Sequence, residues 1–146
     1  MPDEEKKLKL AIKNAEKLHG HLGPFLVIGV RMGKTAQKNL NTNTTENKLR
    51  ATVKIPLSPP FSCVLDGIQA VTKCTVGNQK LKIENSQKEI TARFETQNSN
   101  KTIQISVTPK MVEELMNKLS KGASDKKLAW KIAQMPESQL FTIEKQ

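Results

Sequence analysis

Residues 49–72 decide the fold, because they join the stretch Leu49-Arg50-Ala51-Thr52-Val53-Lys54-Ile55 to the stretch Cys63-Val64-Leu65-Asp66-Gly67-Ile68-Gln69-Ala70-Val71-Thr72. In the first stretch apolar and polar residues alternate, as they do in a half-buried strand, and Pro56 ends it. In the second the apolar residues recur with helical spacing, and Ser62 stands at the expected N-cap. The segment therefore predicts a strand followed directly by an inserted helix.

The flanking sequence predicts more helices at both ends. Residues 4–19 carry an apolar helical face that Gly20 should end, and Pro24 suits the first turn of a second helix reaching about Leu40. Downstream, three alternating segments near 81–83, 90–94 and 103–107 predict an antiparallel meander. Two further helices are expected, from Pro109 to Gly122 and around 128–133.

This order of elements favours the α+β class. We expect a largely antiparallel sheet with helices packed on one face, a helix–helix N-terminus, and a single domain spanning residues 1–146. A chain of 146 residues is long enough to bury a substantial core.

The composition points away from membranes. Hydrophobic residues make up 36% of the chain, and no apolar run approaches the ~20 residues of a spanning helix. The N-terminus shows no signal-peptide pattern. We therefore expect a cytoplasmic protein with no membrane partner.

The net charge of +10 raises the question of nucleic-acid binding. The basic residues are nearly all Lys and are spread along the chain, and there is no Tyr and little other aromatic surface for base stacking. The pattern predicts no specific nucleic-acid partner, and a Lys-coated, solubilising surface accounts for the charge.

The candidate site lies at the junction of the first two helices. His19 and His21 flank Gly20 there, and Cys63 and Asp66 lie within the first turns of the inserted helix. A helix N-terminus lowers a thiol pKa and favours the thiolate. Imidazoles, a thiolate and a carboxylate form a ligand set suited to Zn²⁺. The alternative is packed histidines and a buried, inert cysteine.

Cys74 is not expected at this site. A continuous helix separates it from Cys63 by ~16 Å at ~1.5 Å per residue, too far for a shared metal or a disulfide. It is expected in the core or at a subunit contact.

Gly29 and Gly33 lie four residues apart in the second predicted helix, with Arg31 between them. Their spacing lets another backbone approach closely, and a fixed guanidinium can face an anion. Arg31 is therefore a candidate for binding a cofactor, and Gln69 in the inserted helix is a second candidate.

The sequence resembles the FmdE-like family, which is associated with formylmethanofuran dehydrogenase. Residues 18–24, Leu18-His19-Gly20-His21-Leu22-Gly23-Pro24, resemble its His-Gly-His-x-Cys-Pro signature, and residues 63–69 with 72–77 resemble its Cys-x-x-Asp-Ala-Ile-Gln and Thr-Gly-Cys-Thr-x-Gly segments. The end, Ser138-Gln139-Leu140-Phe141, is similar to the family's closing stretch. The resemblance implies an α+β core domain, an intertwined homodimer, and a metal, often zinc, near His19, His21 and Cys63.

The chain departs from this pattern in two ways. Gly23 stands where the signature has cysteine, so a thiolate ligand is missing, and no cysteine follows Gly77, so the chain is a core-only form without a C-terminal zinc finger.

Three functions remain open on these grounds. The first is a zinc-associated accessory or binding protein linked to the molybdenum or tungsten formylmethanofuran dehydrogenase, to methanogenesis or to related one-carbon metabolism, in association with a larger oxidoreductase complex. The second is a small enzyme in which Cys63 is a nucleophile or ligand, Asp66 positions it, and His19 or His21 is the general base. The third is a structural or regulatory dimer with a degenerate site. The chain lacks iron–sulfur ligands and a dinucleotide fingerprint, which favours an accessory role over a stand-alone oxidoreductase.

Overall fold

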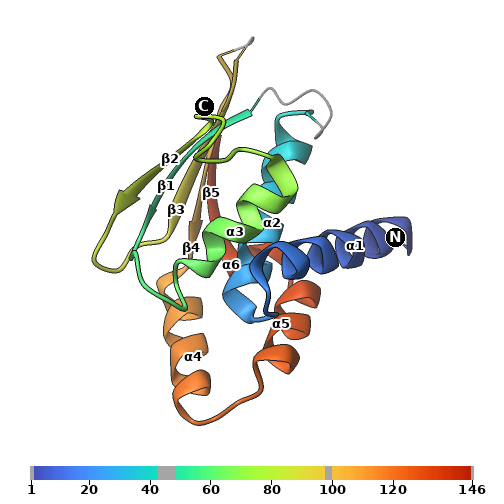
Figure 1. Ribbon diagram of the computed structural model, residues 1–146, viewed down its shortest axis with the longest axis vertical. Helices are drawn as coiled ribbons and strands as arrows, with labels where there is room; N and C mark the ends of the chain where they lie inside the picture. The colour runs from blue at the N-terminus through green and yellow to red at the C-terminus, as the bar shows by residue number, and fades with distance from the viewer. Residues whose placement is uncertain (1, 43–48, 98–99, 146) are drawn as a thin grey trace.

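The computed structural model describes residues 2–42, 49–97 and 100–145. They form one α+β unit in which helices cover one face of a five-stranded sheet (Figure 1). The helices are α1 (Pro2–His19), α2 (Pro24–Asn39), α3 (Cys63–Thr72), α4 (Pro109–Ser120), α5 (Asp125–Gln134) and α6 (Glu137–Leu140), and the strands are β1 (Leu49–Ile55), β2 (Leu81–Asn85), β3 (Thr91–Thr96), β4 (Thr102–Val107) and β5 (Phe141–Lys145).

The sheet has the order β2-β1-β3-β4-β5. Val53 of β1 pairs with Ala92 of β3 in antiparallel register and with Ile83 of β2 in parallel register. The predicted meander is therefore wrong for residues 81–83, since β2 returns beside β1 through α3, as a parallel neighbour must after a helical crossover. The antiparallel majority of the sheet is as predicted.

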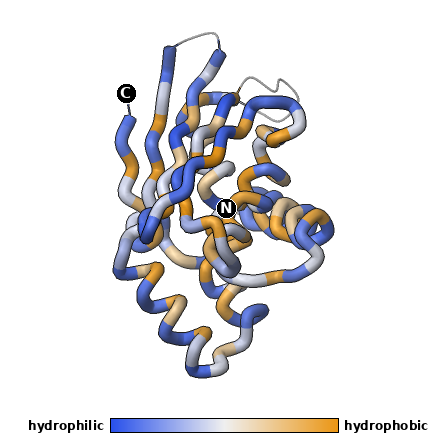
Figure 2. The backbone as a smooth tube through the Cα atoms, turned by 60° about the vertical axis from the view of Figure 1, so that its left-hand side comes forward, coloured by the Kyte–Doolittle hydropathy of each residue, from blue (hydrophilic) through white to orange (hydrophobic). Residues whose placement is uncertain are grey.

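Alternation along the strands separates the two faces of the sheet. In β1, residues 49, 51, 53 and 55 are buried while Arg50 and Lys54 are exposed. Figure 2 shows the same alternation of hydrophilic and hydrophobic positions along the strands. The apolar face packs on the helices, and the opposite face stays polar.

Helices α2 and α3 cross at unusually short range. A Cβ on Gly29 would stand 2.1 Å from the Val64 carbonyl oxygen, and one on Gly67 would stand 2.3 Å from that of Leu26. Only glycine permits this backbone-to-backbone contact. The crossing fixes the start of α3, which carries Cys63 and Asp66, against the N-terminal half of α2.

The helix ends match most of the predicted signals. Gly20 takes a φ of +88° just after α1, and Pro24 occupies the first turn of α2. Ser62 is the residue before α3, but its side chain makes no capping hydrogen bond. The predicted cap is therefore a backbone turn, in which the Cys63 N–H donates to the Pro60 carbonyl.

Two elements are not foreseen by the sequence patterns, α6 and β5. They follow Pro136, and β5 pairs with β4 at the edge of the sheet, with Ile143 opposite Ile105. No helix in the part of the chain that the structure describes is long and apolar enough to cross a membrane.

Candidate functional site

His19 and His21 sit on either side of the turn that joins α1 to α2. His19 is the last residue of α1 and is largely covered, whereas the His21 side chain is 60% exposed. Their ring centroids are 6.5 Å apart. The positive φ of Gly20 turns the chain between them, so the two rings come from opposite sides of one corner.

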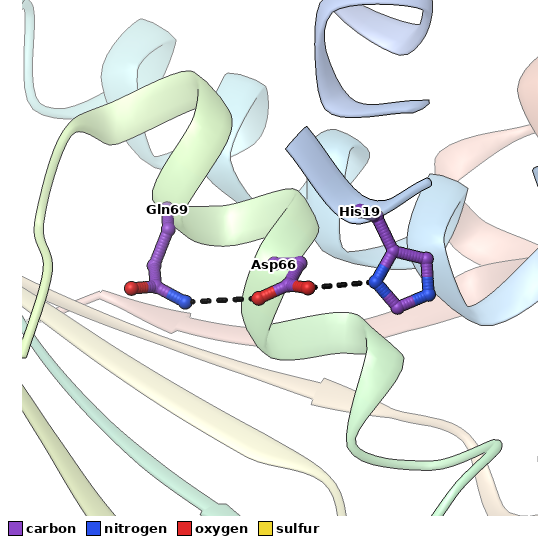
Figure 3. Close-up of polar contacts among 3 residues, drawn as sticks. All are labelled: His19, Asp66 and Gln69. Atoms are coloured by element: carbon purple, nitrogen blue, oxygen red, sulfur yellow. Dashed lines mark hydrogen bonds and ion pairs between the residues drawn. The ribbon is translucent and has the colours of Figure 1, made fainter. Parts of the chain in front are cut away.

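His19, Asp66 and Gln69 form a hydrogen-bonded chain (Figure 3). The His19 Nδ1 lies 2.6 Å from the Asp66 Oδ2, and the Gln69 Nε2 donates to the Asp66 Oδ1 over 3.2 Å. An ionised carboxylate only accepts hydrogen bonds, so the His19 Nδ1 is the donor. This leaves the lone pair of a neutral His19 ring on Nε2, where it can bind a metal ion or take a proton.

Cys63 begins α3 and is partly buried. Burial raises the pKa of its thiol and the negative charge of Asp66 raises it further; a backbone hydrogen bond at the start of the helix lowers it in part, and Asp125 adds the smallest raising effect. The predicted lowering of this pKa is therefore wrong, because desolvation and two carboxylates outweigh the helix N-terminus. Cys63 is a thiol at neutral pH.

These groups border a small cavity of about 190 Å³. Its walls come from the α1–α2 junction, the start of α2, the corner before α3, and the facing ends of α4 and α5. The lining residues are His19, His21, Gly23, Pro24, Phe25, Leu26, Pro59, Pro60, Cys63, Leu119 and Asp125. The structure thus brings His19, His21 and Cys63 to one place, with Asp66 bonded to His19 at its edge.

Asp125 is the functional candidate that sequence reasoning missed. It is the first residue of α5, and its Oδ2 lies 3.4 Å from the His21 Nε2. In the sequence it reads as an ordinary acidic residue after the N-cap Ser124, which stabilises a helix start anywhere. Only the tertiary packing of α5 beside the α1–α2 junction reveals its place at the cavity.

The donor chemistry around the cavity suits zinc, but the described residues hold no preformed ligand cluster. Among residues 2–42, 49–97 and 100–145, no three His, Cys, Asp or Glu side chains converge as they would around a metal ion. Gly23 contributes no ligand, and a Cβ there would lie 3.4 Å from the His21 ring. His19 is bonded to Asp66 and His21 lies beside Asp125, so His19, His21 and Cys63 are not gathered as a three-donor set in this arrangement.

Arg31 and Gln69 occupy different surroundings from each other. Gln69 is bonded to Asp66, as described above. Arg31 lies away from the cavity and donates hydrogen bonds to the carbonyls of Ile132 and Met135 at the end of α5. Desolvation lowers its pKa, although the carboxylate of Glu137 partly opposes this. The Arg31 side chain therefore ties α2 to α5.

Arg31 also borders a second, larger hollow of about 450 Å³ between α1, α2 and α6. Its walls mix basic and acidic residues, and the Thr35 hydroxyl donates to Glu137 over 2.8 Å on one side of it. The hollow shares no lining residue with the His19–Cys63 cavity.

Cys74 is fully buried and takes no part in the cavity. Its Sγ lies 3.2 Å from the Leu49 carbonyl oxygen, and burial raises the pKa of its thiol. The prediction of a core position is confirmed.

Comparison with known proteins finds a relative of this chain and a matching family model. A protein of Archaeoglobus fulgidus described as a probable S-adenosyl-L-methionine-binding protein is 31% identical over 77 residues, which are 53% of this chain. The matched region spans only 21% of that relative. The family model described as "FmdE, Molybdenum formylmethanofuran dehydrogenase operon" matches residues 18–142, which include the whole cavity. The chain therefore belongs to the FmdE family.

Proposed function

We propose that this chain is a metal-associated accessory or binding protein that serves the formylmethanofuran dehydrogenase system of one-carbon metabolism. Membership of the FmdE family supports the link to that system. The observation that carries the binding role is the cavity in which His19, already hydrogen-bonded to Asp66, faces the same space as Cys63. The chain is an auxiliary of the oxidoreductase complex and leaves the redox chemistry to other chains.

Zinc is the ligand that we propose for this cavity, held by His19, His21 and Cys63. A histidine that binds a metal commonly donates its other ring N–H to a carboxylate, as His19 does to Asp66. When bound, the ion would supply a Lewis acid and would favour the thiolate of Cys63. Asp66 and Gln69 would then orient the His19 ring without touching the ion.

The size of the cavity supports a small ligand. Organic ligands usually occupy pockets of roughly 300–1,000 Å³, and this cavity measures about 190 Å³. The volume suits an ion with a few attached atoms. The nucleoside-sized ligand named for the A. fulgidus relative is therefore not our proposal for this cavity.

Isothermal titration with Zn²⁺ tests the binding role. We expect about one zinc ion per chain, and we expect Cys63→Ala and His21→Ala each to abolish binding because each removes a donor. Cys74→Ala is the matched control, since it removes the other thiol at a site outside the cavity. A wild-type protein that folds normally and takes up no zinc would end this proposal.

An independent enzyme is the second candidate function. The bond from His19 to Asp66 is the arrangement that orients a general base, and Cys63 lines the same cavity. The raised pKa of Cys63 weighs against a resident thiolate nucleophile. The alkylation rate of Cys63 separates the two candidates.

We also propose that the chain forms a homodimer, as its family resemblance implies. Light scattering should give twice the mass of one chain. A monomer at every concentration would contradict the proposal. A dimer that takes up no zinc would instead favour a structural or regulatory role with a degenerate site.

A further inference from the structure

Most of helix α1 lies outside the region matched by the family model. The match begins at residue 18, so only the end of α1 falls within it. In Figure 1 the N-terminal part of α1 projects away from the sheet and from the other helices. Because it contributes little to the core at that end, its exposed surface calls for an explanation of its own.

The two faces of α1 differ sharply. Ile12 and Ala15 are fully buried and hold the C-terminal half of the helix against the body of the protein. The outer face carries four lysines at intervals of three and four residues, all exposed: Lys6, Lys9, Lys13 and Lys17. Residues spaced in this way lie on one side of a helix. The outer face is therefore a continuous basic ridge.

Two leucines accompany the ridge. Leu10 is 61% exposed and Leu18 is 59% exposed, and both are among the most exposed large apolar side chains of the described chain. With ~100° between successive residues, Leu10 falls directly beside Lys17 around the helix axis, and Leu18 lies further round on the same flank. The ridge thus offers apolar contacts next to positive charge.

The ridge lysines make none of the ion pairs found among the described residues, which join His19 to Asp66, His21 to Asp125 and Lys54 to Glu89. Acidic residues of the same helix, Asp3, Glu5 and Glu16, stand three or four residues from Lys6, Lys9 and Lys13 and offset part of their charge. Like charges three and four residues apart repel one another and weaken the helix that carries them. An anionic partner would relieve this repulsion, and burial of Leu10 and Leu18 would add apolar contact.

We propose that the outer face of α1 is a docking surface for a protein whose acidic surface surrounds apolar pockets. A phosphate backbone offers no apolar counterpart to Leu10, and the ridge has neither arginine nor aromatic residues for reading or stacking on bases. A membrane-binding helix needs a broad apolar face, and that face of α1 is packed against the protein. The mixed surface fits an acidic protein best.

The test uses a synthetic acidic peptide that forms an amphipathic helix, with Leu at every third or fourth position and Glu on the opposite face. Its binding is measured by fluorescence anisotropy. We expect the wild type to bind it and the triple change Lys6→Glu, Lys9→Glu and Lys13→Glu to weaken binding by about tenfold or more. The matched control changes three exposed lysines in or next to α4 and α5 to Glu, with the same change in net charge: Lys110, Lys121 and Lys126. It should retain most of the affinity.

A second variant separates docking from simple charge attraction. Leu10→Ser with Leu18→Ser keeps every lysine, and we expect it to weaken peptide binding at ~0.5 M salt, where long-range attraction is screened. Circular dichroism checks that each variant keeps its helices. Zinc titration should be unchanged in all of them, so failure here is distinct from failure of the cavity proposal.

Four outcomes would overturn the proposal. The first is that the wild type does not bind the peptide, and the second is that the ridge and control variants lose equal affinity. The third is that the leucine variant binds as tightly as the wild type. The fourth is that α1 binds a 20-base-pair DNA duplex or phosphatidylglycerol vesicles more tightly than the peptide. The last would reassign the ridge to nucleic acid or to membranes.

Discussion

The His19 Nδ1 lies 2.6 Å from the Asp66 Oδ2, and this contact joins the end of α1 to the first turns of α3. Gln69, one turn further along α3, donates to the other oxygen of the same carboxylate. Both Asp66 oxygens are therefore engaged, and the carboxylate is held in one orientation. The His19 ring takes its orientation from that carboxylate.

This arrangement predicts the tautomer of His19. We expect its neutral ring to carry the proton on Nδ1, because the carboxylate can only accept. Long-range ¹H–¹⁵N correlation spectra should show this tautomer for His19, and Asp66→Ala should shift it toward the Nε2-protonated form that free histidine prefers. His21, which is exposed, is the internal control. An unchanged His19 pattern in Asp66→Ala would show that the contact does not set the tautomer.

The reactivity of Cys63 should reflect its raised pKa. Burial is the largest cause, followed by the charge of Asp66, with a smaller part from Asp125. We expect iodoacetamide to react with Cys63 more slowly at pH 8 than with a free thiol, and Asp66→Asn to accelerate the reaction more than Asp125→Asn does. Cys74, being fully buried, should stay unreacted in the native protein. Fast wild-type alkylation would instead favour the enzyme alternative.

The same pKa shift fixes the sign of a stability effect. A thiol with a raised pKa in the folded state binds its proton more tightly there than in the unfolded chain. Its contribution is complete below the unfolded pKa and is lost as the pH rises through the folded value. The free energy of unfolding should therefore fall above about pH 8.5 through Cys63 and Cys74. In urea titrations at several pH values, Cys63→Ala should lose less unfolding free energy above about pH 8.5 than the wild type does. An equal loss in both proteins would contradict this prediction.

The glycines of the α2–α3 crossing should tolerate no side chain. A Cβ at Gly29 or Gly67 would collide with a backbone carbonyl of the facing helix, so we expect Gly29→Ala and Gly67→Ala each to cost ~2 kcal/mol or more in the free energy of unfolding. Gly23→Ala is the matched control, because its Cβ would make ordinary contact with the exposed His21. Urea denaturation of the three variants measures the difference, and equal stability would contradict the crossing geometry.

Much of the fold could be predicted because its signals are local. The alternation of residues 49–55 and the helical spacing of residues 63–72 predict the bounds of β1 and α3 as the structure has them. Strand partners are not local, however. The alternation near Leu81 and Ile83 fits either a parallel or an antiparallel neighbour, and the return beside β1 depends on where α3 packs. Strand β5 escapes prediction because it is only five residues long, Phe141–Lys145, and directly follows a short helix.

For the candidate site too, the local features can be predicted from the sequence and the features set by tertiary packing cannot. His19, His21, Cys63 and Asp66 stand out by residue type and spacing, and the structure gathers them around one cavity. The pKa shift of Cys63 is predicted in the wrong direction, because burial, its largest cause, is set by tertiary packing, and the charge of Asp66 adds to it. The chemistry of a guanidinium at position 31 is evident from the sequence, but its acceptors, the carbonyls at the end of α5, are set by tertiary packing.

Gly23→Cys should strengthen zinc binding. The backbone of Gly23 is extended, at φ −146° and ψ 171°, so any residue can occupy the position. A side chain there would border the cavity beside the His21 ring, and a thiolate is a good zinc ligand. We expect the zinc affinity to rise by about tenfold or more in chelator competition, and the Co²⁺-loaded variant to show a stronger thiolate charge-transfer band. Gly23→Ser, which has nearly the same shape with a poor zinc ligand, should match the wild type. If the cysteine and serine variants bind zinc equally, position 23 does not face the ion, and the missing thiol cannot account for weak binding by the natural chain.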